Sequence, residues 1–127
     1  MLYTFEYDLS YAPSMPVAEI RIGKRNTAPG LALQAIIDSG ADATIIPIQW
    51  LDQVQARRSE RAWMNTAAGT RRIVSLYVIS LRIGDYERRA LSVIAGFDSE
   101  EAMIGRDVLN HLIVTLNGLA NVTELTQ

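Results

Sequence analysis

The sequence has 127 residues, of which 49% are hydrophobic and 20% charged, and these proportions are typical of a globular chain rather than a disordered one. Its formal charge is only −2, from 12 basic and 14 acidic residues, so no overall field favours nucleic acid as a partner. No cysteine is present, which excludes disulfides, thiol catalysis and thiolate metal sites.

Targeting and membrane signals are not visible in the sequence. The first residues, 1–8, lack the basic segment and apolar stretch of a secretory signal peptide. No apolar run approaches the roughly 20 residues that a membrane-spanning helix needs. We therefore expect a soluble, cytoplasmic protein that is not attached to a membrane and has a single domain over residues 1–127.

The first half of the chain has the pattern of short strands separated by turns. Apolar and polar residues alternate in several runs, and glycine or proline breaks each run. Residues 48–54 instead suit one or two helical turns, with Ile48, Leu51 and Val54 on the inner face. The predicted strands of this half are residues 2–9, 17–22 (ended by Gly23 and Lys24), 31–37 and 43–46 (stopped by Pro47).

The second half is again rich in strands. Residues 57–61 are interpreted as a solvated segment, and the small polar residues after them predict an exposed hairpin. Gly84-Asp85 and Asn117-Gly118 predict turns, and Asp107 can cap a short helix. The predicted strands of this half are residues 73–83, 87–95, 113–116 and 119–125. The whole pattern favours a closed or sandwich-like all-β domain over a parallel α/β sheet.

The stretch over residues 35–47 is the most distinctive, because a short acidic segment with the composition of a turn lies between two apolar segments. Asp38-Ser39-Gly40 has the composition of a turn, and Gly40 permits a close approach that a Cβ would block. Burial of a carboxylate at the end of a strand costs free energy unless the group is hydrogen-bonded, forms an ion pair or takes part in a reaction. By itself the motif is also typical of a plain turn in which Asp38 caps backbone amides.

A second segment supports a functional interpretation of the first. Residues 102–112 run apolar, then Gly105-Arg106-Asp107, then apolar again. Together and in this order, the two segments resemble the signature segments of retroviral-type, or retropepsin-like, aspartic proteases. The resemblance covers residues 35–47 closely and residues 102–118 almost as closely, whereas only the layout matches between them.

The resemblance implies a closed acid-protease-like β barrel with one lobe per chain. In this family two paired carboxyl groups, of which one keeps a proton, activate water to attack a peptide bond. Asp-Ser-Gly occurs once here, so the chain supplies one catalytic carboxylate, Asp38. The second would be Asp38 of the partner subunit in a two-fold homodimer. The implied activity is that of an aspartic endopeptidase on an extended peptide or protein substrate, without cofactor or metal.

The same resemblance implies roles for the neighbouring residues. Ser39 would hydrogen-bond across the pair of active-site turns, and a local hydroxyl-to-backbone bond is the alternative. Gly40 would let the substrate backbone pass close by, and Ala41 belongs to the same supporting turn. Asp42 and Arg106 would form a bidentate ion pair that holds the turn to the second segment. The alternative for these two is a pair of unrelated surface charges.

The hairpin tip would act as a flap that closes over an extended substrate. It has a single glycine, Gly69, whereas the retroviral type is glycine-rich. The expected flap residues are Asn65, Thr66, Ala67, Ala68, Gly69 and Thr70.

Other polar groups are not interpreted as chemistry. His111 is the sole histidine, so the sequence does not indicate a catalytic triad or a histidine-rich metal site. Residues 38–42 lack the later ligands of a calcium loop. The paired arginines are interleaved with acids, which indicates solvated faces rather than a nucleic-acid site. Two further functions stay compatible with the sequence: a dimeric peptide-binding module that does not cut, and a structural dimer with Asp38 as a turn residue.

Overall fold

The computed structural model describes residues 1–66, 68–97 and 101–127. These residues are mostly β, and no helix among them is long and apolar enough to cross a membrane. The strands are β1 (Tyr3–Glu6), β2 (Val17–Lys24), β3 (Leu31–Ile37), β4 (Ile45–Pro47), β5 (Arg57–Asn65), β6 (Arg71–Ile83), β7 (Tyr86–Gly96), β8 (Ala102–Ile104), β9 (Ile113–Asn117) and β10 (Val122–Thr126). The helices are α1 (Ile48–Gln53) and α2 (Arg106–Leu109).

Six strands close into a barrel. Hydrogen bonding runs from β2 through β3, β8, β4, β7 and β6, and β6 pairs back with β2 to complete the ring. Among the described strands, β5 pairs with β6 alone and lies outside the ring. The expected closed all-β barrel is therefore confirmed. Among the described residues, the largest fully buried side chains are Ile20, Ile22, Ile46, Leu51, Ile79, Leu81, Ile83, Ile104, Leu125, Val93, Val108 and Thr44.

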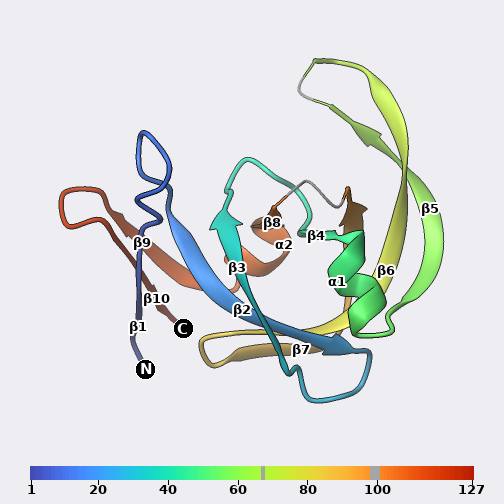
Figure 1. Ribbon diagram of the computed structural model, residues 1–127, viewed down its shortest axis with the longest axis horizontal. Helices are drawn as coiled ribbons and strands as arrows, with labels where there is room; N and C mark the ends of the chain where they lie inside the picture. The colour runs from blue at the N-terminus through green and yellow to red at the C-terminus, as the bar shows by residue number, and fades with distance from the viewer. Residues whose placement is uncertain (67, 98–100) are drawn as a thin grey trace.

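Both ends of the chain meet in a separate three-stranded sheet of order β1-β10-β9. Its neighbouring strands are antiparallel, and Tyr3 of β1 lies opposite Leu125 of β10. Figure 1 shows this sheet beside one end of the barrel, with the two termini close together. One face of the sheet packs on the barrel, since Thr123 and Leu125 are buried.

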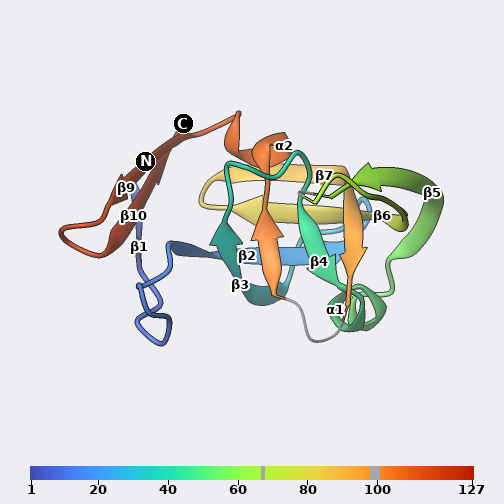
Figure 2. The same ribbon diagram turned by 90° about the horizontal axis from the view of Figure 1, so that it is seen from above.

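Two parallel pairings bring distant segments of the chain side by side. β3 runs parallel to β8, with Ile37 opposite Ile104, and β4 runs parallel to β7 while also meeting β8. Because parallel strands end at the same edge of a sheet, the loops that follow β3 and β8 emerge together. Residues 38–44 and 105–107 follow these two strand ends, so the two sequence segments described above are neighbours in space (Figure 2).

β2 is longer than the strand predicted from the sequence. It continues through Gly23 and Lys24, which pair with Ser80 and Ile79 of β6. A Cβ on Gly23 would lie 2.8 Å from the Ser80 hydroxyl oxygen and 3.1 Å from the Ala28 carbonyl oxygen. The glycine therefore permits the close pairing that completes the barrel, and it does not end the strand.

Two other segments differ from the sequence prediction. Residues 57–61 are exposed as predicted, but they form part of β5, whose other edge no described strand covers. The predicted turn at Asn117-Gly118 is also different, because Asn117 still pairs within β9 and residues 118–121 make the connection. The turn at Gly84-Asp85 is confirmed, with Gly84 at a φ of +58°.

Candidate active site

The segment between β3 and β4 forms a tight loop at the edge of the barrel. β3 ends at Ile37, the half-buried Asp38 follows it, and Ser39 and Gly40 are exposed. The Asp38 amide donates a hydrogen bond of 3.0 Å to the Ile104 carbonyl oxygen, which continues the β3–β8 pairing. The Asp38 carboxylate therefore lies at the end of a fixed strand, where solvent or a ligand can reach it.

The turn itself also holds the Asp38 carboxylate. Its Oδ1 accepts a hydrogen bond of 2.9 Å from the Gly40 amide, as in the plain turn considered above. Within the described residues, this is the sole hydrogen bond that the carboxylate accepts, so its second oxygen is available. A Cβ on Gly40 would lie 3.2 Å from Oδ1 and would press on the carboxylate.

Gly105 lets the second segment cross in contact with this loop. A Cβ there would lie 2.7 Å from the carbonyl carbon and oxygen of Ala43, and 2.9 Å from the Ala41 carbonyl oxygen. The next residue, Arg106, donates its amide to the same Ala41 oxygen at 2.9 Å. The two segments thus meet backbone to backbone, with no room for a side chain at this position.

A buried polar network joins the same two segments. Thr44 is fully buried, and its amide and hydroxyl both donate to the Asp107 carboxylate, at 3.0 and 2.8 Å. The Thr44 hydroxyl oxygen also accepts a hydrogen bond of 3.2 Å from the Gly105 amide. Because unpaired polar groups are costly when buried, this closed set of hydrogen bonds fixes the loop on the second segment.

Asp107 therefore does not cap α2 as the sequence suggested. The N-cap position belongs to Gly105 and has no side-chain hydrogen bond, whereas Asp107 lies in the first turn and bonds Thr44. Sequence reasoning missed Thr44 and Asp107 as parts of the site. The available signal was a carboxylate directly after Gly105-Arg106, but no local pattern links it to a threonine 63 positions away.

The Arg106 guanidinium spans the loop after β3. Its Nη2 forms an ion pair with Asp42, and its Nη1 donates to the Ser39 carbonyl oxygen at 2.7 Å. The guanidinium thus binds one carboxylate oxygen and one backbone oxygen, and the predicted bidentate bond to the carboxylate is wrong. The Asp42 side chain is 91% exposed, so the pair contributes little to stability and mainly orients the loop.

Ser39 and Ala41 complete the loop in different ways. In the part of the chain that the structure describes, the Ser39 hydroxyl has no hydrogen-bond partner, so the local alternative considered above is not seen. Ala41 contributes its backbone: its amide donates to the Asp38 carbonyl oxygen at 3.2 Å, and its carbonyl accepts from Arg106. The exposed hydroxyl of Ser39 therefore remains able to bind a group outside this chain.

The residues predicted as a flap lie at the tip of hairpin β5–β6, which projects beyond the barrel (Figure 1). The Thr66 amide donates to the Thr70 carbonyl oxygen at 2.8 Å, and their hydroxyl oxygens are 2.7 Å apart. Gly69 has a φ of +81°, which its missing Cβ permits. The remaining predicted flap residues are Asn65 at the end of β5, the exposed Ala68, and Ala67, which lies outside the described residues.

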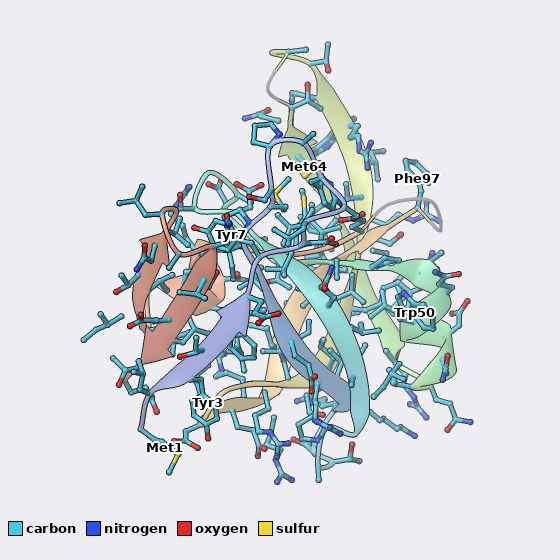
Figure 3. All side chains as sticks on the ribbon, turned by 60° about the vertical axis from the view of Figure 1, so that its left-hand side comes forward. Met1, Tyr3, Tyr7, Trp50, Met64 and Phe97 are labelled. Carbon is cyan, nitrogen blue, oxygen red and sulfur yellow. The ribbon has the colours of Figure 1, made fainter. Side chains whose placement is uncertain are left out.

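A pocket of about 440 Å³ lies between this hairpin and the outer face of the barrel, close to Asp38 in the chain. Ile36, two residues before Asp38, belongs to its apolar wall, and Arg72 belongs to the hairpin wall. Figure 3 shows Met64 on the hairpin, below its tip. The lining residues are Tyr11, Ile36, Ile45, Met64, Arg72, Glu101 and Met103.

Tyr11 and Glu101 form the polar side of this pocket. The Tyr11 hydroxyl donates a hydrogen bond to the Glu101 carboxylate, and this bond, with lesser contributions from burial and nearby negative charge, raises the pKa of Tyr11 to about 12. Since the bond needs the protonated hydroxyl, it is complete below the ordinary pKa of 10 and is lost as pH rises through about 12. At neutral pH the contact therefore ties the N-terminal loop to the residue that precedes β8.

Among the described residues, no group of three or more histidine, aspartate or glutamate side chains is arranged to hold a metal ion. His111 instead stacks on Tyr86, with ring centroids 5.3 Å apart and an angle of 14° between the rings. This contact is structural packing between β7 and the segment after α2.

Replacing Thr44 by valine is expected to lower the free energy of unfolding by about 1–3 kcal/mol. Valine preserves the volume, but Asp107 loses a donor and the buried Gly105 amide loses an acceptor. Urea unfolding at a fixed protein concentration measures the change. Thr27→Val is the control, because that hydroxyl donates to Lys24 in an exposed turn, and its effect should stay within about 0.5 kcal/mol. Equal losses in both variants would contradict the importance of the network.

Residues 18–111 match the family model described as "gag-polyprotein putative aspartyl protease". This match covers both segments that meet at the Asp38 loop, together with hairpin β5–β6. No curated protein sequence matches the chain.

Several solved structures share the fold. A retropepsin-like aspartic protease from Rickettsia conorii has a TM-score of 0.63 at 11% identity, covering 98% of this chain and 91% of its own. EIAV protease complexed with the inhibitor HBY-793 has a TM-score of 0.57 at 15% identity, with 84% and 93% covered. The retroviral protease-like domain of Ddi1 from Leishmania major has a TM-score of 0.51 at 17% identity, with 81% of each chain covered. The fold is therefore the retropepsin-like single-lobe fold.

Proposed function

Because this chain belongs to the gag-polyprotein aspartyl protease family, we propose that it is an aspartic endopeptidase that acts as a homodimer. One domain over residues 1–127 carries the activity, and Asp38 is its catalytic residue. The observation that carries the proposal is how the Asp38 loop is held. The Thr44–Asp107 hydrogen bonds and the backbone contact at Gly105 fix the loop, while the Asp38 carboxylate keeps an available oxygen at the surface.

In the proposed dimer, Asp38 faces Asp38 of the partner subunit across the two-fold axis. Two carboxyl groups at such a short distance cannot both ionise, so the pair shares one proton. The ionised group takes a proton from water, whose oxygen bonds to the peptide carbonyl carbon, while the other group protonates the carbonyl oxygen. As this tetrahedral intermediate collapses and the C–N bond breaks, the group that took the proton from water passes it to the departing amine. The other group regains its proton from a hydroxyl of the intermediate. No step uses a metal or a cofactor.

The neighbouring residues orient the turn and the substrate. The exposed hydroxyl of Ser39 bonds the partner subunit's turn, which agrees with its lack of a partner within the described chain. Gly40 and Ala41 present a backbone surface without large side chains to an extended peptide. Arg106 and Asp42 hold the loop in place. Residues 65–70 form the flap over the peptide, which lies in the pocket between the hairpin and the barrel.

The surface that we assign to the dimer contact is the three-stranded sheet. Apolar side chains are exposed along its β9–β10 hairpin: Ile113 is 61% exposed, Leu116 53% and Leu119 102%. Among the described strands, β9 pairs with β10 alone, so its other edge can pair with a second copy. Residues 110–112 are all that separate β9 from α2, so the sheet directly follows the second segment in the chain.

Cleavage of a peptide library between about pH 4 and pH 7 tests this function, at concentrations where sedimentation shows a dimer. We expect cleavage that a statine-type transition-state mimic blocks. If the dimeric protein binds peptides from the library but cuts none, the function is that of the dimeric peptide-binding module. If a dimer neither binds nor cuts, both functions are wrong.

A further inference from the structure

The charge of this chain is concentrated on one hairpin. Five arginines and one glutamate give residues 57–72 a formal charge of +4, so the rest of the chain, whose total is −2, carries −6. We call residues 57–72 the arginine hairpin. Its charged residues lie on β5 and at the start of β6. Arg57 and Arg58 lie opposite barrel residues of β6, whereas the other three arginines lie farther along the hairpin, which projects beyond the barrel (Figure 1). The five arginines are Arg57, Arg58, Arg61, Arg71 and Arg72.

These arginines are not neutralised within the described chain. The ion pairs found among the described residues join Arg21 to Glu19, Arg89 to Glu87 and Arg106 to Asp42, and none involves the arginine hairpin. Two hairpin arginines stack on aromatic rings instead. The Arg71 guanidinium carbon lies 4.7 Å from the centre of the Trp63 ring, and that of Arg72 lies 5.2 Å from the centre of the Phe97 ring. Such stacking orients the guanidinium groups, and neither forms an ion pair within the described residues.

The arginine hairpin also forms a wall of the pocket that Ile36 lines. Met64 and Arg72, which lie opposite each other in the hairpin, line this pocket. Figure 3 shows Met64 and Phe97 beside the same hairpin. A peptide that enters the pocket therefore passes Arg72, whose field extends about 10 Å at 0.1 M salt.

We propose that the arginine hairpin selects polypeptides in which acidic residues flank the apolar segment that enters the pocket. This inference rests on the proposed function, because it names the class of substrate for that site. The acidic preference belongs to the flanks and not to the pocket, since Arg72 and Glu101 both line the pocket and offset each other's charge. The flanking carboxylates meet the exposed arginines of β5, where both charge and the free strand edge favour them.

Protection against aggregation explains part of this pattern but not all of it. Charged side chains on an edge strand prevent edge-to-edge pairing, and this accounts for Arg57, Arg58 and Arg61 on β5. Arg71 and Arg72 also lie beside a free edge, because among the described strands β6 pairs with β7 only from Leu76 onward. Edge protection does not explain why Arg72 stacks on Phe97 and lines the pocket. The positive charge therefore extends from the free edge towards the pocket.

Fluorescein-labelled peptides with one apolar core, flanked on both sides by glutamates, serines or lysines, provide the test. Anisotropy measures their binding to the Asp38→Asn protein, and cleavage by the unmodified protein is measured in parallel. We expect the glutamate-flanked peptide to bind at least about tenfold more tightly than the serine-flanked peptide at low salt. The two affinities should come within about twofold of each other at 0.5 M salt, since screening removes the difference.

Two double variants of equal charge separate the hairpin from overall charge. Arg58→Glu with Arg61→Glu should abolish the preference, whereas Arg25→Glu with Arg82→Glu, also exposed, should retain most of it. If the charge-reversed hairpin variant does not fold, Arg58→Gln with Arg61→Gln removes the two charges instead, and circular dichroism checks that this variant is folded. Equal binding of the three peptides, or preferential binding of a single-stranded oligonucleotide, overturns the inference. Absence of cleavage with an intact glutamate preference would overturn the proposed function alone.

Discussion

Replacing Asp38 by asparagine is expected to reduce kcat/KM for peptide cleavage by about 10³-fold or more, while the fold and the dimer remain intact. Asparagine keeps an oxygen that can accept the Gly40 amide bond, so the turn retains its geometry. It cannot take a proton from water, which removes the base of the reaction. Initial rates of the purified variant measure the loss, and a urea unfolding curve close to that of the unmodified protein shows that the structure survives. Retained activity would exclude Asp38 as the catalytic residue.

Mixing the Asp38→Asn variant with the unmodified protein shows whether the two subunits of a dimer form one shared active site or each have their own. If each active site needs Asp38 and Asp38 of the partner subunit, random exchange of equal amounts leaves about a quarter of the dimers active. If each subunit acted alone, about half of the activity would remain. Activity should also fall on dilution as the dimer dissociates, with a midpoint that matches the dissociation measured by sedimentation.

The parts of the site that could be predicted from the sequence are those encoded by neighbouring residues. A β-rich run followed by Asp38-Ser39-Gly40 predicts a carboxylate on a turn, and the structure has that turn after β3. The second segment was recognised because Gly105-Arg106 stands between apolar residues. Both are short-range patterns, and the parallel pairing of β3 with β8 brings them together.

The parts that could not be predicted depend on contacts between distant residues. A local capping rule places Asp107 at the start of α2. In the structure the Asp107 carboxylate instead accepts two hydrogen bonds from Thr44 and belongs to the buried network. Arg106 was expected to bind the Asp42 carboxylate with both nitrogens, but the Ser39 carbonyl oxygen lies within reach of one of them. Residues 57–61 carry a high charge typical of a loop, yet pairing with β6 makes them a strand. In each case a partner far away in the sequence decides the local structure.

Replacing Gly105 by alanine is expected to lower the free energy of unfolding by about 3 kcal/mol. The new Cβ would lie 2.7 Å from Ala43 and 2.9 Å from the Ala41 carbonyl oxygen, and these backbone atoms can move only if the Asp38 loop moves. Gly105 has a φ of −95°, which any residue adopts, so the cost arises from the clash and not from backbone strain. A displacement of the loop by about 1 Å is also expected to reduce kcat by about 10²-fold.

Gly30→Ala is the matched control for this substitution. No atom lies within 4 Å of a Cβ built on Gly30, and its φ is outside the left-handed region. The same change of side chain there should be neutral or should stabilise the protein by up to about 1 kcal/mol, because alanine restricts the unfolded chain. Urea unfolding of both variants at one protein concentration measures the difference. A Gly105→Ala protein as stable and as active as the control would mean that the two segments can separate without loss, and that their close contact does not hold Asp38 in place.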